Sequence, residues 1–288
     1  MACTALVALS GCSLKSVALH QIADELASQD NGDEEDLELA RDASAFYLKF
    51  SESVLFRQPD HAALAESVAS GFVQYAYAFV ANPADRIEQA DAREAARLRQ
   101  RAGRLYDRAR RHALRALAAN DPSFNETLDD LASPDRLVIP PSRVGLAYWA
   151  AAAWGGLISL SKDDPEVVAD LPLAIHLAER AWAADPAWGD GALTGLLARF
   201  ESSRPGGDPA RALALYDQAI GQAGERSISP LLAKAEGYAQ ATGDRALFEH
   251  LLGAALAPRP ATSNGHALED QVVRQRARWL LESADDLF

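Results

Sequence analysis

The residues of this chain that could do chemistry are few and widely separated. Its six histidines are scattered along the sequence: His20, His61, His112, His176, His250 and His266. A zinc enzyme needs converging ligands, and no two of these histidines stand at the spacing of metal ligands. Ser159-Leu160-Ser161-Lys162 matches Ser-x-x-Lys, in which a lysine activates a serine nucleophile, but the partner motifs of those enzymes are missing. No phosphate-binding glycine loop or dinucleotide fingerprint is present, so we expect no enzyme, no metal and no cofactor.

Composition narrows the class of protein further. The chain has 288 residues, of which 49% are hydrophobic, and a net charge of −13. A chain this apolar is expected to fold, and its abundant alanine favours helix. Its acidity argues against nucleic acid as a partner. No apolar stretch reaches the roughly 18 residues of a membrane-spanning helix.

One cysteine indicates covalent attachment to lipid. Leu9-Ser10-Gly11-Cys12 follows the apolar run 5–8 and resembles the lipobox of bacterial lipoproteins, in which a peptidase cuts before the cysteine and the thiol is acylated. We expect residues 1–11 to be a clipped signal peptide, because no Lys or Arg precedes the apolar run. Cys12 would then be the lipidated first residue of the mature protein. The alternative is a fortuitous apolar N-terminus on a cytosolic helical protein.

A repeated pattern of small residues predicts the helices that would position any functional site. They recur at spacings of four and three, which places them on one face of a helix. Three copies are clear and a fourth is weaker: Ala109, Ala113 and Ala116; Ala174, Ala178 and Ala181; Ala212, Tyr216 and Ala219; and Ala246, His250 and Gly253. Prolines follow several of these segments and end the helix. The pattern is similar to the second helix of a tetratricopeptide repeat.

A first helix should precede each of these second helices. The candidates are residues 62–80, 144–160, 188–200 and 230–240. We therefore expect an all-α fold of cryptic tetratricopeptide-like repeats, with about four helix pairs in one domain over residues 12–288. Two extra helices near 14–27 and 37–56 would precede the pairs, and a helix over 268–284 would cap the end.

Six arginines form a basic stripe along one expected helix: Arg97, Arg101, Arg104, Arg108, Arg111 and Arg115. Between positions 91 and 117 there are nine arginines and three acids, in a chain that is otherwise strongly acidic. Such a stripe is either a solvated helix face paired with acids elsewhere or a docking surface for an acidic partner or a sister subunit.

Aromatic residues and glycines gather in a second group: Tyr148, Trp149, Trp154, Gly155, Gly156 and Trp188. Two consecutive glycines inside a helix cost about 1 kcal/mol each relative to alanine, which indicates a close approach of another element or an opening beside them. The group either lines an apolar ligand pocket or pore, or packs as an ordinary repeat core.

Taken together, these segments resemble the T-component family of TRAP transporters, the TatT-like lipoproteins. The resemblance rests on the lipobox, on SGFVQYAYAFV at 70–80, on YWAAAAWGGLISLSKDDPEVVADLP at 148–172, and on DPAWGDGAL, SRPGGD and RARWLLESADDLF further along. It covers nearly the whole chain, and the clipped leader is the main departure from the family pattern.

The resemblance implies a lipid-anchored periplasmic protein that docks the solute-binding protein of a TRAP transporter and receives its small organic ligand. It also implies a homo-oligomer, a trimer, with a pore-like opening through each subunit. The serine after Cys12 favours the inner leaflet of the outer membrane. The alternative function is a stand-alone periplasmic carrier of an apolar small molecule.

Overall fold

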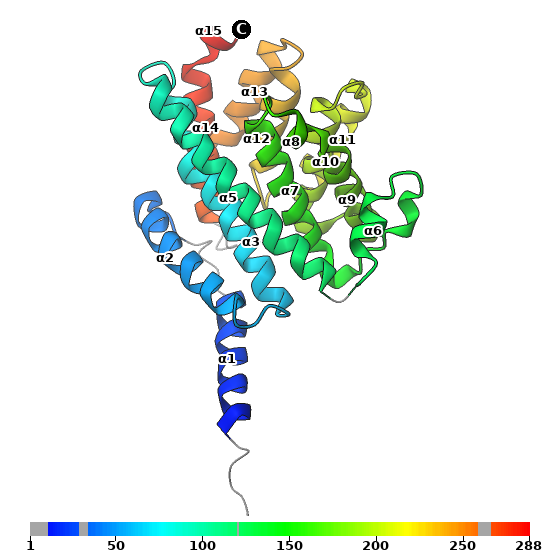
Figure 1. Cartoon of the computed structure of the whole chain (residues 1–288). Coiled ribbons are helices and arrows are strands. Elements are labelled where there is room, and N and C mark those ends of the chain that lie inside the picture. The colour runs from blue at the N-terminus through cyan, green and yellow to red at the C-terminus, as the bar shows by residue number, and fades with distance from the viewer. Residues whose placement is uncertain (1–10, 29–33, 120, 259–265) are drawn as a thin grey trace, which may run out of the picture.

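A computed structural model describes residues 11–28, 34–119, 121–258 and 266–288. Within these ranges the chain forms helices and turns and no strand, which confirms the expected all-α fold (Figure 1). None of the helices described is both long and apolar enough to cross a bilayer.

Two of the expected first helices begin at the predicted residues, 62 and 144, and a third begins at 229, next to the predicted 230. The N-terminal half contains α1 (Gly11–Ser28), α2 (Leu37–Leu55), α3 (Ala62–Ala76), α4 (Asn82–Ile87), α5 (Ala92–Ala118), α6 (Phe124–Asp129) and α7 (Val144–Leu160). The C-terminal half contains α8 (Pro165–Ala169), α9 (Leu171–Ala184), α10 (Ala192–Ser203), α11 (Pro209–Ala223), α12 (Ser229–Lys234), α13 (Arg245–Leu256), α14 (Ala267–Glu282) and α15 (Ala284–Leu287). Two π-helical turns, η1 (Tyr77–Ala81) and η5 (Ala235–Ala239), extend α3 and α12.

Aspartate side chains start many of these helices. Asp36, Asp91, Asp208 and Asp244 each accept a hydrogen bond from a backbone N–H of the first helical turn. These bonds satisfy N–H groups that have no partner within the helix, and the negative charge suits the positive end of the helix dipole.

Small residues allow α5, α9 and α11 to pack closely against their neighbours. Ala109 and Ala113 on α5 and Ala174 and Ala178 on α9 are fully buried, as the spacing predicts. α5 packs between α3 and α7, α7 packs on α9, and α11 packs on α10. Consecutive helices therefore pair along the chain. That these pairs are tetratricopeptide-like repeats within one domain stays a prediction.

The fourth predicted copy of the small-residue face is wrong. Ala246, His250 and Gly253 are exposed, and α13 instead buries Phe248 and Leu252 with their apolar neighbours. Large apolar side chains gain more from burial than the methyl group of an alanine, so they decide which face of α13 turns inward.

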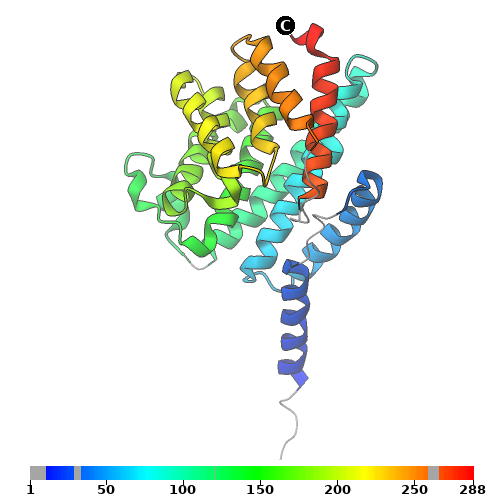
Figure 2. The same ribbon diagram turned by 180° about the vertical axis from the view of Figure 1, so that it is seen from behind.

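The C-terminal helices return to the start of the fold. α14 contacts α2, and Arg276 on α14 binds Asp85 on α4 at 2.8 Å, although 191 positions separate them. Figure 2 shows α14 in front of the first helices, and its contacts with α2 and Asp85 mean that the helices follow a closed course. By contrast, the first turns of α1 project away from the other helices (Figures 1 and 2).

Candidate functional site

Three of the predicted pocket residues come together at one point of the fold. The ring centroids of Tyr148 and Trp149 on α7 lie 4.8 Å apart, and the ring centroid of Trp188 lies 4.6 Å from that of Tyr148. All three rings are partly buried. Trp188 belongs to η4 (Trp188–Gly191), a short 3₁₀ turn, so α10 begins at Ala192 and not at 188 as the sequence predicts.

Trp154, Gly155 and Gly156 do not join this cluster. The indole N–H of Trp154 donates a hydrogen bond to Asp170 at 3.1 Å, and the guanidinium of Arg110 lies 5.0 Å from the centroid of the Trp154 ring. A Cβ atom at Gly155 would lie 2.8 Å from the Phe200 ring, and one at Gly156 would lie 2.9 Å from the Tyr106 ring. The two glycines therefore let aromatic rings approach α7, and those rings occupy the space beside them.

A cluster of charges that joins the half-exposed Arg199 of α10 to a buried ion pair is absent from the sequence prediction. Arg199 contacts Glu236 of η5 at 3.4 Å, and Arg276 of α14 contacts the same carboxylate at 2.9 Å. The side chains of Glu236 and Arg276 are only 14% and 12% exposed, whereas that of Arg199 is 46% exposed. Arg199 is therefore reached by water beside a buried ion pair.

The positive charge of Arg199 acts to lower the pKa of four tyrosines from four elements, although burial outweighs it in each: Tyr77 on η1, Tyr106 on α5, Tyr148 on α7 and Tyr216 on α11. Burial raises the pKa of Tyr77 to about 12, assisted by the negative charge of Glu236. Burial likewise raises the pKa of Tyr148, assisted by the carboxylate of Glu269. These phenols keep their protons, so they can donate hydrogen bonds.

Two irregular turns supply part of this cluster. Tyr77 lies in η1 and Glu236 in η5, the two π-helical turns of the described chain. π-Helical turns are rare and occur frequently at functional sites. Tyr148 belongs both to the tyrosines around Arg199 and to the aromatic cluster with Trp149 and Trp188. Tyr148 therefore links the charge of Arg199 to the aromatic cluster, and a cation with phenol donors and apolar rings is a combination that can bind a small organic anion.

The basic stripe divides into paired and unpaired arginines. Three of its members bind acids: Arg97 binds Glu94, Arg108 binds Glu52 and Arg111 binds Asp107. The other three, Arg101, Arg104 and Arg115, make no ion pair with a described residue.

The partner of Arg108 is a buried carboxylate that joins α2 to α5. The side chain of Glu52 is 1% exposed and receives hydrogen bonds from Arg108 and from Lys49, the latter at 2.6 Å; its Oε1 also lies 2.8 Å from Nε2 of His112. Burial alone would raise the pKa of Glu52, but these contacts outweigh it and lower the pKa to about 2. Arg108 therefore links α5 to α2, a structural role that the stripe pattern alone does not reveal.

The remaining predicted groups are the lipobox and the Ser-x-x-Lys motif. Gly11 and Cys12 begin α1, whereas the apolar run before them lies outside the described residues, as does the side chain of Cys12. The hydroxyl of Ser159 donates to the carbonyl of Gly156 at 2.8 Å, a local bond at the end of α7.

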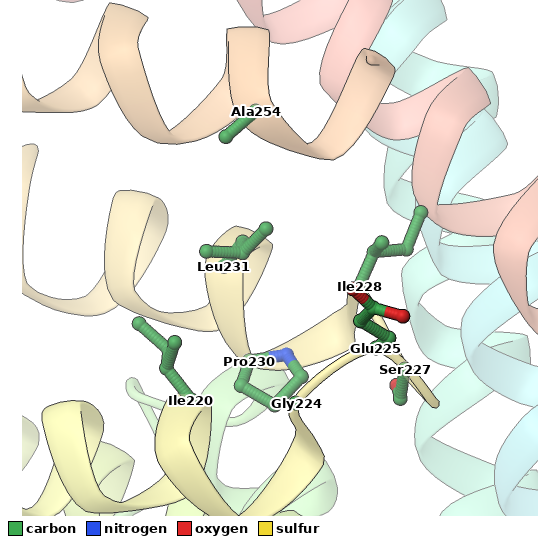
Figure 3. A pocket seen from close by; sticks show the side chains of 8 residues that line it. All are labelled: Ile220, Gly224, Glu225, Ser227, Ile228, Pro230, Leu231 and Ala254. Carbon is green, nitrogen blue, oxygen red and sulfur yellow. The ribbon is translucent and has the colours of Figure 1, made fainter. Parts of the chain in front are cut away.

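Two cavities lie apart from the aromatic cluster. One of about 280 Å³ opens between α11, α12 and α13, where Ile220, Leu231 and Ala254 line it with mostly apolar atoms (Figure 3). The other, of about 480 Å³, lies between the α2–α3 connection and the end of α5, and Arg115 of the basic stripe borders it.

Comparisons with known proteins place the chain in a transporter context. The sequence model of the TRAP transporter T-component family matches residues 33–288. A protein of Treponema pallidum (strain Nichols), described as uncharacterized, is 25% identical over 303 aligned positions, which cover 97% of this chain and 94% of that protein.

Proposed function

Because this chain belongs to the TRAP transporter T-component family, we propose that it docks the solute-binding protein of its transporter and receives a small organic ligand from it. The family itself gives the chain an accessory role in a TRAP transporter and is not known as an enzyme family. The observation that carries the ligand-binding part is Arg199, a half-exposed cation whose charge acts on four tyrosines.

A carboxylate is the group that this arrangement suits best. Guanidinium binds carboxylate with two parallel hydrogen bonds, and the ion pair of Arg199 with Glu236 is long, at 3.4 Å. The protonated phenols of Tyr77 and Tyr148 would donate further hydrogen bonds to the bound oxygens. The rings of Trp149 and Trp188, which both lie against Tyr148, would cover the apolar part of the ligand.

The docking surface for the solute-binding protein would be formed by the three arginines of the basic stripe that make no ion pair with a described residue. Arg101, Arg104 and Arg115 have no ion pair with a described residue, so their charges are available to an acidic surface on the solute-binding protein or on a sister subunit. The attachment to the membrane is an acyl group on Cys12, at the projecting end of α1 (Figure 1). The protein would work as a periplasmic homotrimer on the inner leaflet of the outer membrane.

Calorimetric titration tests the ligand. We expect the purified chain to bind one of a panel of small carboxylates and not the matching amides. Arg199→Gln should abolish binding, whereas Arg97→Gln, which removes an exposed arginine paired with Glu94, should leave it unchanged. Equal binding of carboxylates and amides, or equal binding by the two variants, would contradict the proposal.

A stand-alone carrier of an apolar molecule is the second candidate. The mostly apolar cavity between α11, α12 and α13 supports it (Figure 3). Native mass spectrometry separates the two: a co-purified apolar molecule that is lost in Leu231→Trp and kept in Arg199→Gln would favour the carrier.

A further inference from the structure

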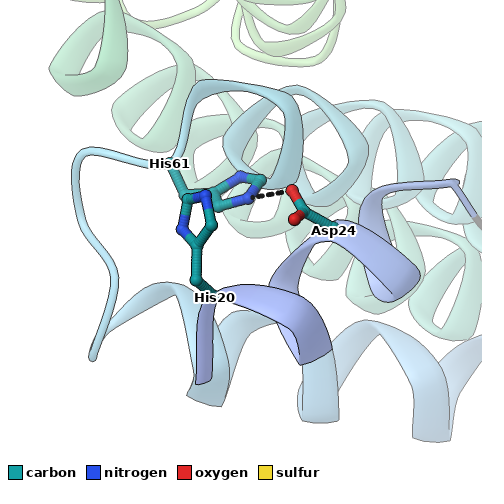
Figure 4. Close-up of side chains that lie close together, drawn as sticks. All are labelled: His20, Asp24 and His61. Carbon is teal, nitrogen blue, oxygen red and sulfur yellow. Dashed lines mark hydrogen bonds and ion pairs between the residues drawn. The ribbon is translucent and has the colours of Figure 1, made fainter. Parts of the chain in front are cut away.

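α1 meets the rest of the protein at a cluster of three metal-binding side chains. His20 and Asp24 stand four residues apart, so they share one face of α1, and His61 caps the N-terminus of α3 (Figure 4). One candidate ligand atom from each residue lies within 4.8 Å of the other two. The prediction that the histidines do not converge is therefore wrong for His20 and His61, because the fold joins two residues that are distant in sequence.

We propose that His20, Asp24 and His61 bind a divalent transition-metal ion, for which Zn²⁺ is the natural probe. Two imidazole nitrogens and one carboxylate oxygen are a common three-ligand set for zinc, and water completes the tetrahedron. His20 and Asp24 are exposed, so water can reach the fourth position, whereas the ring of His61 is 6% exposed and is held in place.

The three side chains need to move only a short way to hold the ion. Zinc ligands lie about 2.0–2.2 Å from the metal, so the three atoms must move closer than 4.8 Å. The exposed side chains of His20 and Asp24 can rotate to close this gap, since each is attached to the same turn of helix and lies free of the core. The hydrogen bond of 2.9 Å between Nε2 of His61 and Oδ1 of Asp24 already brings two of the ligand atoms together.

The position of the proton on the His61 ring affects how tightly the site binds metal. Nδ1 of His61 accepts a hydrogen bond from the N–H of Leu64 at 3.1 Å, so the neutral ring carries its proton on Nε2. When the metal takes Nε2, the proton moves to Nδ1 and the bond from Leu64 is lost. One capping hydrogen bond is small beside three metal–ligand bonds, so this exchange weakens binding without preventing it.

The ion would fix the direction of α1. In the part of the chain that the structure describes, α1 packs on α2 and α3 and buries Ala23 and Leu26, while its first turns project outward (Figures 1 and 2). A metal that joins α1 to the start of α3 adds a strong cross-link at that junction. This proposed metal site is argued from His20, Asp24 and His61 alone and does not depend on the proposed function.

Zinc titration of the full chain tests the site, with Cys3→Ser and Cys12→Ser in every sample so that no thiol binds the metal. We expect one equivalent of Zn²⁺ to bind and to slow amide hydrogen exchange in residues 20–28. His20→Ala and Asp24→Asn should each weaken binding at least about tenfold, as even the loss of an outer-shell partner does. His250→Ala, which removes an exposed histidine of α13, should bind as the parent does.

His61 needs a gentler change because it also caps α3. Asn is among the preferred capping residues, so His61→Asn keeps the helix start while it removes the imidazole, and zinc binding should fall. Melting curves without metal show that each variant is folded. Zinc affinity that is the same in the parent, His20→Ala and Asp24→Asn overturns the proposal, as does an equal loss in His250→Ala.

Discussion

Replacing Glu52 by glutamine should destabilise the protein through the junction of α2 and α5. The unperturbed pKa of this carboxyl group is 4.5 and its pKa in the fold is about 2, a difference that corresponds to about 3 kcal/mol. Loss of one member of a buried charge pair costs about 3–5 kcal/mol when the other stays buried. Here the side chains of Arg108 and Lys49 are 35% and 58% exposed, so water can solvate them. We therefore expect Glu52→Gln to lower the free energy of unfolding by about 2–3 kcal/mol.

Urea unfolding at pH 7, followed by circular dichroism, measures this loss. Glu25→Gln, which removes an exposed carboxylate of α1, is the matched control and should change stability by less than about 0.5 kcal/mol. A Glu52→Gln variant as stable as that control would show that the cluster contributes nothing net.

The same carboxylate fixes the direction of the pH dependence. Since the pKa of Glu52 is lower in the fold than in the unfolded chain, its stabilisation is fully present above a pH of about 4.5. It is lost as the pH falls from there toward about 2. Carbon NMR of the Glu52 carboxyl group follows this titration directly, and a midpoint near 4.5 would refute the reasoning.

Three further predictions follow from the fold and the proposed function. Ala178→Trp should destabilise the domain by about 1–3 kcal/mol or more, because Ala178 is fully buried on α9, and a tryptophan at an exposed alanine of the same helix is the control in thermal melts. Reversing Arg101, Arg104 and Arg115 to glutamate should weaken binding of the solute-binding protein about tenfold at low salt and much less in 1 M salt, as surface plasmon resonance would show. Cys12→Ala should release the protein from the membrane fraction on cell fractionation; continued membrane association would contradict lipidation.

The periodic part of the fold could be predicted from sequence because local patterns determine it. α7 begins and ends at residues 144 and 160 as expected, and the alanine faces of α5 and α9 are buried as their spacing predicts. The face of α13 could not be predicted from small residues, since Phe248 and Leu252 outweigh them. The π-helical turns η1 and η5 also leave no periodic signal in the sequence.

The candidate site was only partly predictable for a different reason. Tyr148, Trp149 and Trp188 could be found because aromatic side chains stand out in an alanine-rich helix, and the fold brings them together. Arg199 and Glu236 lie on separate elements and belong to no motif, so only the packing of α10 against η5 brings them together. Arg108, by contrast, fits the stripe pattern but binds the buried Glu52, and a stripe variant that includes it would also perturb the fold.

The sharing of Glu236 by two arginines bears on how the proposed ligand would enter. Arg276 binds Glu236 at 2.9 Å and Asp85 at 2.8 Å, and it joins α14 to the start of the fold. Arg199 binds Glu236 at the longer distance of 3.4 Å. If a ligand carboxylate draws Arg199 away, Glu236 keeps Arg276 as its partner and no buried charge is left unpaired, so the main electrostatic cost of ligand entry is avoided. The closed course of the helices would then survive ligand exchange, because the contact that closes it is not the one that the ligand replaces.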